Sequence, residues 1–139
     1  MINIRILLVG VVLAISAFSA QAQDYTKYTE DALKKILSEI ATAESKVLVP
    51  MRDGAGLSTD IYRPKDAEGP VPTIFVRTPY NMNVPSRRTL YNIVEAVSRG
   101  YAYILQNERG RYFSEGKFEI LGYPRTDGYD ALDWVSAQS

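Results

Sequence analysis

Two residue types that carry much of enzyme chemistry are missing from this sequence. Its 139 residues include no cysteine and no histidine. Without cysteine the chain has no disulfides, and without histidine it has no imidazole to exchange protons near neutral pH. The chain by itself therefore contains no Ser-His-Asp triad, no Cys-His dyad and no histidine-ligated metal site. We expect neither a metal nor a cofactor.

The chain also has no net charge. The 16 Lys and Arg residues balance 16 Asp and Glu residues. A balanced chain gives no reason to expect nucleic acid or an anionic membrane as a partner. Because no disulfide is available, the stability of the protein must come from a packed hydrophobic core.

The first 22 residues have the pattern of an export signal. Arg5 is a short basic region, an almost unbroken apolar run extends from residue 6 to residue 17, and Ala20-Gln21-Ala22 has small residues where a signal peptidase cleaves. The run is shorter than the roughly 20 apolar residues of a spanning helix. We therefore expect cleavage after Ala22 and a periplasmic or secreted protein, with a retained signal anchor as the alternative.

Helical and strand periodicity follow in the next segment. Apolar residues at steps of three and four predict a helix over residues 29–43, with Thr29 as its N-cap, within an N-terminal helical segment 23–44. Residues 45–51 and 57–63 are predicted strands around an Asp-Gly turn. Pro50 cannot donate to a strand ladder, so it indicates an edge strand.

The middle of the chain alternates between strand and helix. Apolar and β-branched runs predict buried strands at residues 73–78 and 101–105. Between them, residues 89–99 have helical spacing, and Gly100 is expected to end that helix. Strand, helix and strand in this order predict a right-handed βαβ unit with parallel strands.

A polar loop and a last helix are expected after the second of these strands. The loop covers residues 109–125 and is rich in glycine and charge. Asp127 is expected to cap a helix that reaches Trp134 in the core. Helical spacing places Tyr129, Leu132 and Val135 on its apolar face.

Three blocks of sequence follow the predicted strands or open the last helix. They are Arg77-Thr78-Pro79-Tyr80-Asn81, then Gln106-Asn107-Glu108-Arg109-Gly110-Arg111 running into Ser114-Glu115-Gly116, then Asp127-Gly128-Tyr129-Asp130. In that order they resemble the first part of the catalytic domain of X-prolyl dipeptidyl-peptidase-like and cocaine-esterase-like serine hydrolases, a group that includes acyl esterases and α-amino-acid ester hydrolases. The resemblance covers about residues 47–134. It implies an α/β class with an incomplete α/β-hydrolase fold over residues 45–139, without the nucleophile strand.

The same resemblance implies hydrolysis of an ester or amide bond through an acyl-enzyme. It implies that Tyr80 donates its hydroxyl to the oxyanion of the tetrahedral intermediate, the alternative being a tyrosine that only packs at a strand end. No Gly-x-Ser-x-Gly elbow occurs in the sequence, and Ser114 lacks both that frame and a base. We therefore expect the nucleophile, acid and base outside this chain, which alone should be inactive. The sequence does not distinguish among peptide, ester and β-lactam substrates.

The Arg-Gly-Arg block is expected to form a structural loop beside the site. Gly110 and Gly116 permit tight turns, and Glu115 could pair with either Arg109 or Arg111. The family commonly has Asp where this sequence has Asn107, so a charged partner is not expected at that position.

A second hypothesis is a complete exported binding domain that needs no triad. The missing histidine and cysteine fit it equally well, and ten tyrosines could serve a recognition surface. An argument against the binding domain is that the strand at residues 73–78 would be an unpaired edge of the sheet, with no Pro or bulge to protect it. Gene sequence distinguishes the two. A reading frame that continues past Ser139 into a Gly-x-Ser-x-Gly strand, which we expect, supports the hydrolase, whereas a natural stop codon supports the binding domain or a degraded gene.

Overall fold

The computed structural model describes residues 24–120 and 124–138 of the chain. The predicted export signal, residues 1–22, lies outside this range. Within the described range, no helix combines the length and the apolar character that crossing a membrane requires.

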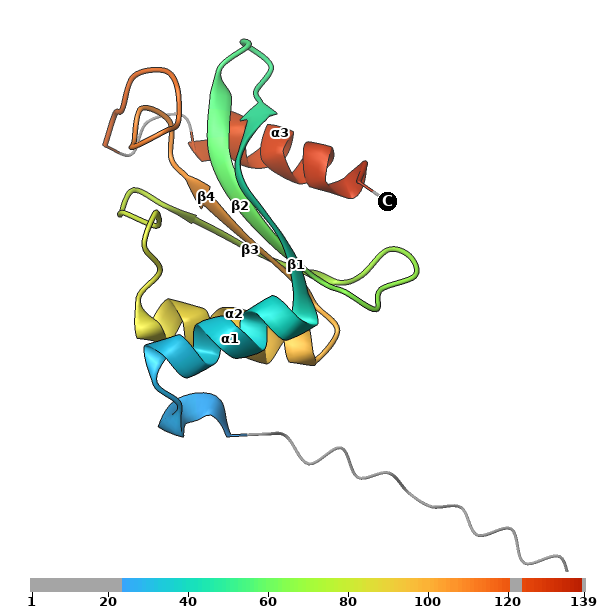
Figure 1. Cartoon of the computed structure of the whole chain (residues 1–139). Coiled ribbons are helices and arrows are strands. Elements are labelled where there is room, and N and C mark those ends of the chain that lie inside the picture. Colours follow the sequence, from blue (N-terminus) through green and yellow to red (C-terminus); the bar gives the residue numbers. More distant parts are fainter. Residues whose placement is uncertain (1–23, 121–123, 139) are drawn as a thin grey trace, which may run out of the picture.

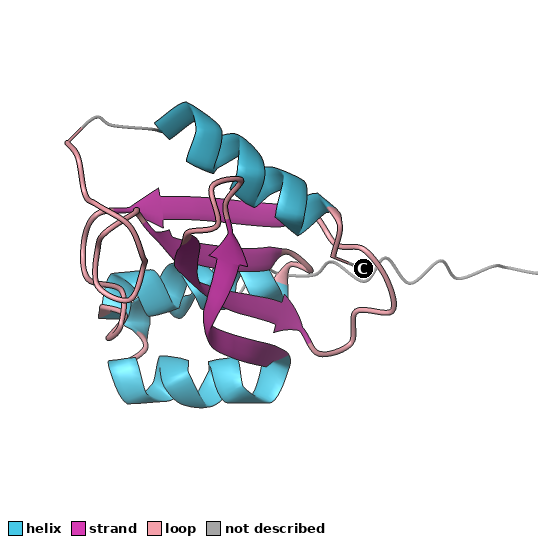
Figure 2. Cartoon of the chain, turned by 90° about the horizontal axis from the view of Figure 1, so that it is seen from above, coloured by secondary structure: helices cyan, strands magenta, loops and turns pink. Residues whose placement is uncertain are grey.

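The described residues form three layers, with a mixed sheet between two helices on one face and one helix on the other (Figures 1 and 2). The strands are β1 (Ala41–Pro50), β2 (Gly56–Pro64), β3 (Thr73–Thr78) and β4 (Ala102–Asn107). The helices are η1 (Tyr25–Lys27), α1 (Glu30–Ile40), α2 (Arg87–Ser98) and α3 (Pro124–Ser136). The strand order is β1-β2-β4-β3, in which only the β3–β4 pair is parallel. The predicted parallel pairing of these two strands is confirmed.

Helix α1 begins where the sequence predicts and ends earlier. The Thr29 hydroxyl accepts a hydrogen bond from the Ala32 N–H at 3.3 Å, which confirms the N-cap. The predicted end at residue 43 is wrong, because Ala41 already pairs with Pro64 across the β1–β2 ladder. Alanine has the highest helix propensity, but propensity is a weak determinant that tertiary pairing overrides, and the ladder with β2 decides the conformation of Ala41. Strand β1 consequently starts at Ala41 rather than at residue 45.

The β1–β2 hairpin turns at the predicted Asp-Gly step. The Gly54 N–H donates to the Met51 carbonyl at 2.9 Å, and Gly54 has a positive φ of 87°. As Pro50 indicates, β1 is an outer strand of the sheet. A register shift between Glu44 and Val47 also interrupts its ladder, and Lys46 at this bulge has a φ of 60°. A bulge and a proline protect the β1 edge against further pairing.

The other outer strand, β3, lacks such protection. It pairs with β4 from Thr73↔Ala102 to Thr78↔Asn107, and within the described residues no strand pairs with its other side. All of β4 is buried, whereas Ile74 of β3 is 39% exposed. The prediction that β3 is a buried strand is therefore wrong for the described part, because its outer side is uncovered.

Helix α2 is two residues longer at its start than predicted. The Ser86 hydroxyl accepts from the Thr89 N–H at 3.2 Å, so the helix begins at Arg87 rather than at Thr89. Serine is a common N-cap residue, but the sequence analysis did not predict Ser86 in this role. Arg99 is the C-cap, and Gly100 follows it with a φ of 83°.

Helix α3 differs most from its prediction. It begins at Pro124 rather than being capped by Asp127, which lies in its first turn. The expected apolar face is not the buried one, because Tyr129 and Leu132 are 66% and 53% exposed. The fully buried Ala131 and the partly buried Trp134 instead pack on a cluster at the β1–β2 end of the sheet, formed by Val49, Met51 and Leu57.

The main core lies on the opposite face of the sheet. Side chains of α1, α2, β2 and β4 meet there, among them Leu33, Ile93, Val94 and Leu105. Because parallel strands end at the same edge of a sheet, the turns that follow β3 and β4 lie next to one another.

Candidate functional site

Tyr80 lies just beyond the carboxyl end of β3, where the sequence predicts a site. Thr78, the last residue of β3, is opposite Asn107, the last residue of β4. Tyr80 is 76% exposed, so it does not pack into the core formed by the described residues. Function collects at the carboxyl ends of strands in sheets of this kind. The ring is thus placed where its hydroxyl can reach a substrate.

Hydrogen bonds from neighbouring groups hold the backbone of this turn. The Tyr80 N–H donates to the Thr78 hydroxyl at 3.2 Å. The Asn107 side-chain amide donates to the Tyr80 carbonyl at 2.8 Å and to the Thr78 carbonyl at 3.3 Å. The Arg111 Nε–H donates to the Pro79 carbonyl at 2.9 Å. No charged partner is needed at Asn107, which serves as an amide donor.

A hollow of about 360 Å³ adjoins Tyr80. It lies between β3 and the start of α2, and its lining includes Val76, Asn81 and Thr89. The lining contains hydroxyl, amide and apolar groups, together with the guanidinium of Arg88. Such a hollow can admit part of a small molecule or a peptide.

The two glycines of the following loop form the predicted tight turns. Gly110 and Gly116 have φ values of 66° and 84°. A Cβ on Gly110 would lie 2.2 Å from the backbone nitrogen of Phe118, so only glycine fits there. Glu115 has a different partner from the arginines that the sequence offered. Its carboxylate accepts from the Gly56 N–H at 2.7 Å, because the loop folds back over the β1–β2 hairpin.

Arg109 joins three separate parts of the fold. Its guanidinium donates to the Asp127 carboxylate at 2.7 and 3.0 Å and to the Asp53 carboxylate at 2.8 and 3.1 Å. The hydrogen bonds to Asp127, and then those to Asp53, raise the pKa of Arg109. The hydrogen bond from Arg109 in turn lowers the pKa of Asp53. The loop after β4, the hairpin turn and the first turn of α3 are thereby tied together.

A second arginine links the sheet to the same helix. Arg77 of β3 donates to the Gln106 side-chain oxygen at 3.0 Å and to the Asp127 carbonyl at 2.5 Å. Gln106, which is fully buried, donates to the Thr59 hydroxyl at 3.0 Å. Burial lowers the pKa of Arg77. Arg77 therefore holds α3 in place rather than lining the hollow beside Tyr80.

The acidic residues of α3 also make contacts outside the helix. Asp130 accepts from the Arg52 guanidinium at 2.7 Å and from the Arg52 N–H at 2.8 Å. Together with the Arg109–Asp127 pair, this contact fastens α3 to the hairpin turn. Sequence could not show these pairs, because their partners lie far away along the chain.

Ser114 is structural, as the sequence suggests. It is buried, its hydroxyl accepts from the Ser58 N–H at 2.8 Å, and the same hydroxyl donates to the Asn107 carbonyl at 2.9 Å. The hydroxyl thus bridges β2 and the end of β4. That role requires a fixed side chain and leaves no proton for nucleophilic chemistry.

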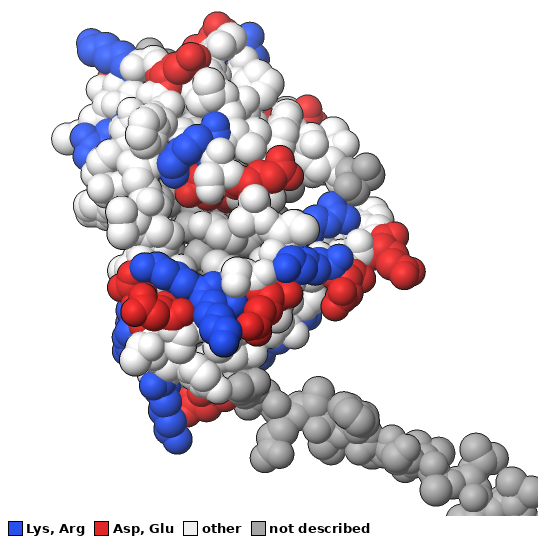
Figure 3. Space-filling view, viewed as in Figure 1, with Lys and Arg blue, Asp and Glu red and all other residues white. Residues whose placement is uncertain are grey.

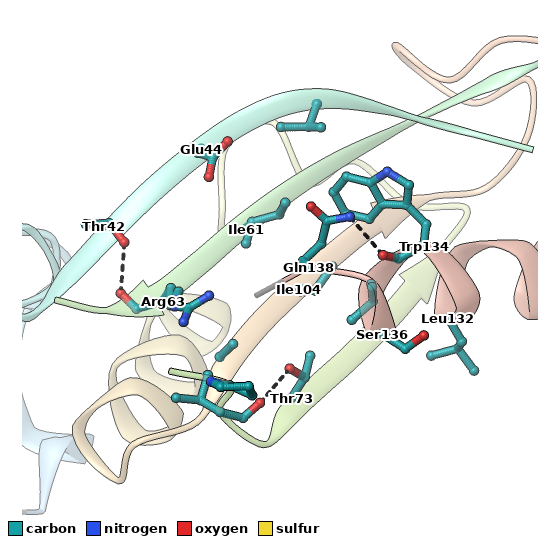
Figure 4. Close-up of a pocket in the computed structure, with 15 residues that line it drawn as sticks. Thr42, Glu44, Ile61, Arg63, Thr73, Ile104, Leu132, Trp134, Ser136 and Gln138 are labelled. Carbon is teal, nitrogen blue, oxygen red and sulfur yellow. Dashed lines mark hydrogen bonds between the residues drawn. The ribbon is translucent and has the colours of Figure 1, made fainter. Parts of the chain in front are cut away.

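A second hollow, of about 470 Å³, lies on the α3 face of the sheet (Figure 4). Trp134 and Gln138 lie across it from Ile61 and Ile104. Tyr80 is not in its lining, and the lining side chains bring no nucleophile together with a base. The hollow beside Tyr80 is therefore the better candidate site.

The rest of the surface gives few chemical signals. On the face shown in Figure 3, Lys and Arg alternate with Asp and Glu, without a large patch of one sign. Within residues 24–120 and 124–138, no cluster of three or more acidic side chains could hold a metal ion.

Known proteins share both the sequence and the fold. The family model of the X-Pro dipeptidyl-peptidases (S15 family) matches residues 53–139. Cocaine esterase from Rhodococcus sp. (strain MB1 Bresler) is 44% identical over 97 residues, which cover 68% of this chain and 17% of the esterase.

Two solved structures share the fold. An α-amino acid ester hydrolase is 29% identical with a TM-score of 0.56, and the match covers 84% of this chain and 22% of the hydrolase. A CocE/NonD family hydrolase from Staphylococcus aureus, 21% identical, has a TM-score of 0.62 over 71% of this chain and 21% of its own, which shows the fold alone.

The sheet and its helices are the first part of an α/β-hydrolase fold, as predicted. The chain spans about a fifth of the length of the relatives that it matches. Because the family model matches more than half of its residues, this chain belongs to the X-Pro dipeptidyl-peptidase (S15) family of hydrolases.

Proposed function

We propose that this chain is part of an exported serine hydrolase that cleaves an ester or amide bond through an acyl-enzyme. The observation that carries the proposal is Tyr80, exposed just past the end of β3 and held against the end of β4 in a chain of this hydrolase family. The substrate class is inferred from printed names: a small molecule from the relatives, an esterase and an ester hydrolase, and a short peptide from the family, the X-Pro dipeptidyl-peptidases.

Tyr80 is the proposed oxyanion-hole donor. In acyl transfer the carbonyl oxygen of the substrate gains negative charge, and a fixed O–H donor stabilises it in the transition state. Tyr80 supplies such a hydroxyl on an exposed ring beside the hollow. The sequence has no histidine and no nucleophile elbow, so the serine, the acid and the base are proposed to come from outside these 139 residues.

The uncovered side of β3 supports this assignment. In the α/β-hydrolase fold the nucleophile strand pairs beside the strand that corresponds to β3. The β1 edge has a bulge and Pro50 against such pairing, whereas β3 has a regular ladder and an exposed Ile74. The exposed Tyr129 and Leu132 of α3 could likewise be covered in the whole enzyme.

Export is a further part of the proposal. Residues 1–22 would direct the protein to the periplasm or outside the cell, and cleavage after Ala22 would remove the apolar segment. N-terminal sequencing of the protein recovered from the producing cell tests this. A start at Gln23 agrees with the proposal, and retention of Met1 on a membrane-bound protein contradicts it.

Hydrolysis of p-nitrophenyl esters and X-Pro anilides tests the activity. We expect no saturable turnover by residues 23–139 alone, and turnover by the longer protein encoded by the same gene. Activity of the short chain that rises with its concentration would point to another mechanism. A gene that stops after Ser139, with a monodisperse and inactive product, would instead favour a binding domain.

A further inference from the structure

An arginine beside Tyr80 has no partner in the described part of the chain. Arg88 lines the same hollow of about 360 Å³ as Tyr80. No hydrogen bond, ion pair or ring contact joins Arg88 to another residue of segments 24–120 and 124–138. Its neighbour Arg87, by contrast, donates to the carbonyls of Thr26 and Tyr28 at 2.9 and 3.2 Å and fastens the start of α2 to the N-terminal turn. The N–H donors of Arg88 are therefore available to a group from outside these segments.

The position of Arg88 in α2 gives no structural reason for an arginine. The first turn of this helix contains Arg87 and Arg88 and no acidic residue. The positive end of the helix dipole lies there, so a cation gains no stability from it. The Arg88 side chain is exposed, so it adds nothing to the core either. An anion in the hollow, however, would be favoured by the charge of Arg88.

The lining of the hollow is suited to an anion because it contains no carboxylate. The Ser86 and Thr89 hydroxyls both line it, and their oxygens are 3.0 Å apart. One of the two hydroxyls donates to the other, which leaves one O–H to donate to a ligand. The hollow on the α3 face, in contrast, has Glu44 in its lining, and that carboxylate would repel an anion.

We propose that Arg88 binds a carboxylate of the substrate, so that the hydrolase prefers esters or amides that carry a negative charge near the bond to be cleaved. The planar guanidinium matches the two oxygens of a carboxylate, and the remaining O–H of the Ser86–Thr89 pair can add a further hydrogen bond. Because Arg88 and Tyr80 line one hollow of small-molecule size, a single substrate can reach both. The preference in hydrolysis rests on the proposed function, whereas the binding of a carboxylate does not.

Kinetics of the longer hydrolase test the preference with two pairs of substrates that differ in charge and hardly in shape. The p-nitrophenyl monoesters of adipate and of its monoamide carry a carboxylate or a carboxamide on the acyl side. The 4-carboxyphenyl and 4-carbamoylphenyl esters of butyrate carry the same two groups on the leaving side. In each pair the measured quantity is the ratio of kcat/KM, carboxylate over carboxamide, and comparing variants cancels the intrinsic reactivity of the substrates.

We expect Arg88→Gln to lower this ratio about tenfold or more in one of the two pairs, which identifies the side of the substrate that bears the charge. The matched control is Arg99→Gln, which removes an exposed arginine at the other end of α2 and should change the ratio less than about twofold. An unchanged ratio for Arg88→Gln in both pairs would overturn the proposal. Loss of stability in Arg88→Gln together with unchanged ratios would assign Arg88 to an ion pair within the longer protein, which likewise overturns it.

A binding measurement separates this proposal from the proposed function. Ligand-observed NMR titrates the longer protein with 4-hydroxybenzoate and, as the uncharged counterpart, 4-hydroxybenzamide. We expect the carboxylate to bind about tenfold more tightly or better, and the difference to fall below about twofold in Arg88→Gln but not in Arg99→Gln. A preference for the carboxylate that persists in Arg88→Gln, or that is absent from the unsubstituted protein, would overturn the proposal. Carboxylate binding that depends on Arg88 in a protein without hydrolytic activity would refute the proposed function alone.

Discussion

Replacing Arg109 with leucine should weaken the attachment of α3 to the loop after β4 and to the hairpin turn. The Arg109 and Asp127 side chains are 14% and 7% exposed, so the substitution leaves a nearly buried carboxylate without its cation. Breaking a buried pair on one side costs about 3–5 kcal/mol. Because this pair borders a hollow open to solvent, we expect the lower end, about 3 kcal/mol of the free energy of unfolding.

Two further variants sharpen this prediction. Arg99→Gln removes an exposed pair with Glu95 one turn away on the surface of α2, and it should cost less than about 0.5 kcal/mol. Adding Asp127→Asn to Arg109→Leu removes the unpaired charge, and it should recover part of the loss.

Urea unfolding at low protein concentration measures these effects. Trp134, the single tryptophan of the chain, lies on α3 against the β1–β2 cluster and reports on the helix by fluorescence. A cost for Arg109→Leu no larger than that of Arg99→Gln would refute this account of the Arg109 contacts. A double variant that is less stable than Arg109→Leu would show that the unpaired charge is not the cause.

The unpaired edge of β3 and the ion pairs of Arg52 and Arg109 lead to two more predictions. Residues 23–139 alone should associate at micromolar concentrations through the unpaired edge of β3, and Ile74→Lys should reduce this association. Size-exclusion chromatography measures the association, and a monodisperse unsubstituted chain would contradict the prediction. Arg52 lowers the pKa of Asp130 and Arg109 lowers that of Asp53, so the stability that these pairs contribute is present above about pH 3.9 and is lost as the pH falls through the lowered values. Urea midpoints between pH 2 and 6 should therefore fall more steeply for the unsubstituted chain than for Arg52→Leu, and parallel curves would contradict it.

Local signals in the sequence were sufficient for most of the framework. Thr29 and the Asp-Gly turn at Gly54 act through bonds to residues a few positions away, so their roles are visible in the sequence. Pro50 indicated an edge strand for a similar reason, since it has no N–H to donate. The β3–α2–β4 order likewise predicted the parallel pair, because a helical crossover connects parallel neighbours.

Long-range contacts decided what the sequence did not reveal. The end of α1 depends on Pro64, the partner of Ala41 across the hairpin. The buried side of α3 depends on which of its residues face the β1–β2 end of the sheet. Ala131 and Trp134 pack there, whereas the more apolar side with Tyr129 and Leu132 stays exposed.

The polar contacts around the candidate site were equally hidden. Asp127 and Asp53 are far apart in sequence, and only the fold brings both to Arg109. For Asn107, the family comparison indicated only that a charge was missing. Its role as an amide donor to the Tyr80 turn depends on the spacing of two strand ends, which no local pattern gives.

The most direct test of the central claim compares kcat of the longer hydrolase with and without Tyr80→Phe. The substitution removes only the hydroxyl, and because the ring is largely exposed, it should not change the stability of the fold. Loss of one oxyanion donor predicts a fall in kcat of about 10²–10³, or about 3–4 kcal/mol, with KM nearly unchanged. A fall of less than about threefold, at equal stability, would contradict the claim and leave Tyr80 as a surface residue of the turn after β3.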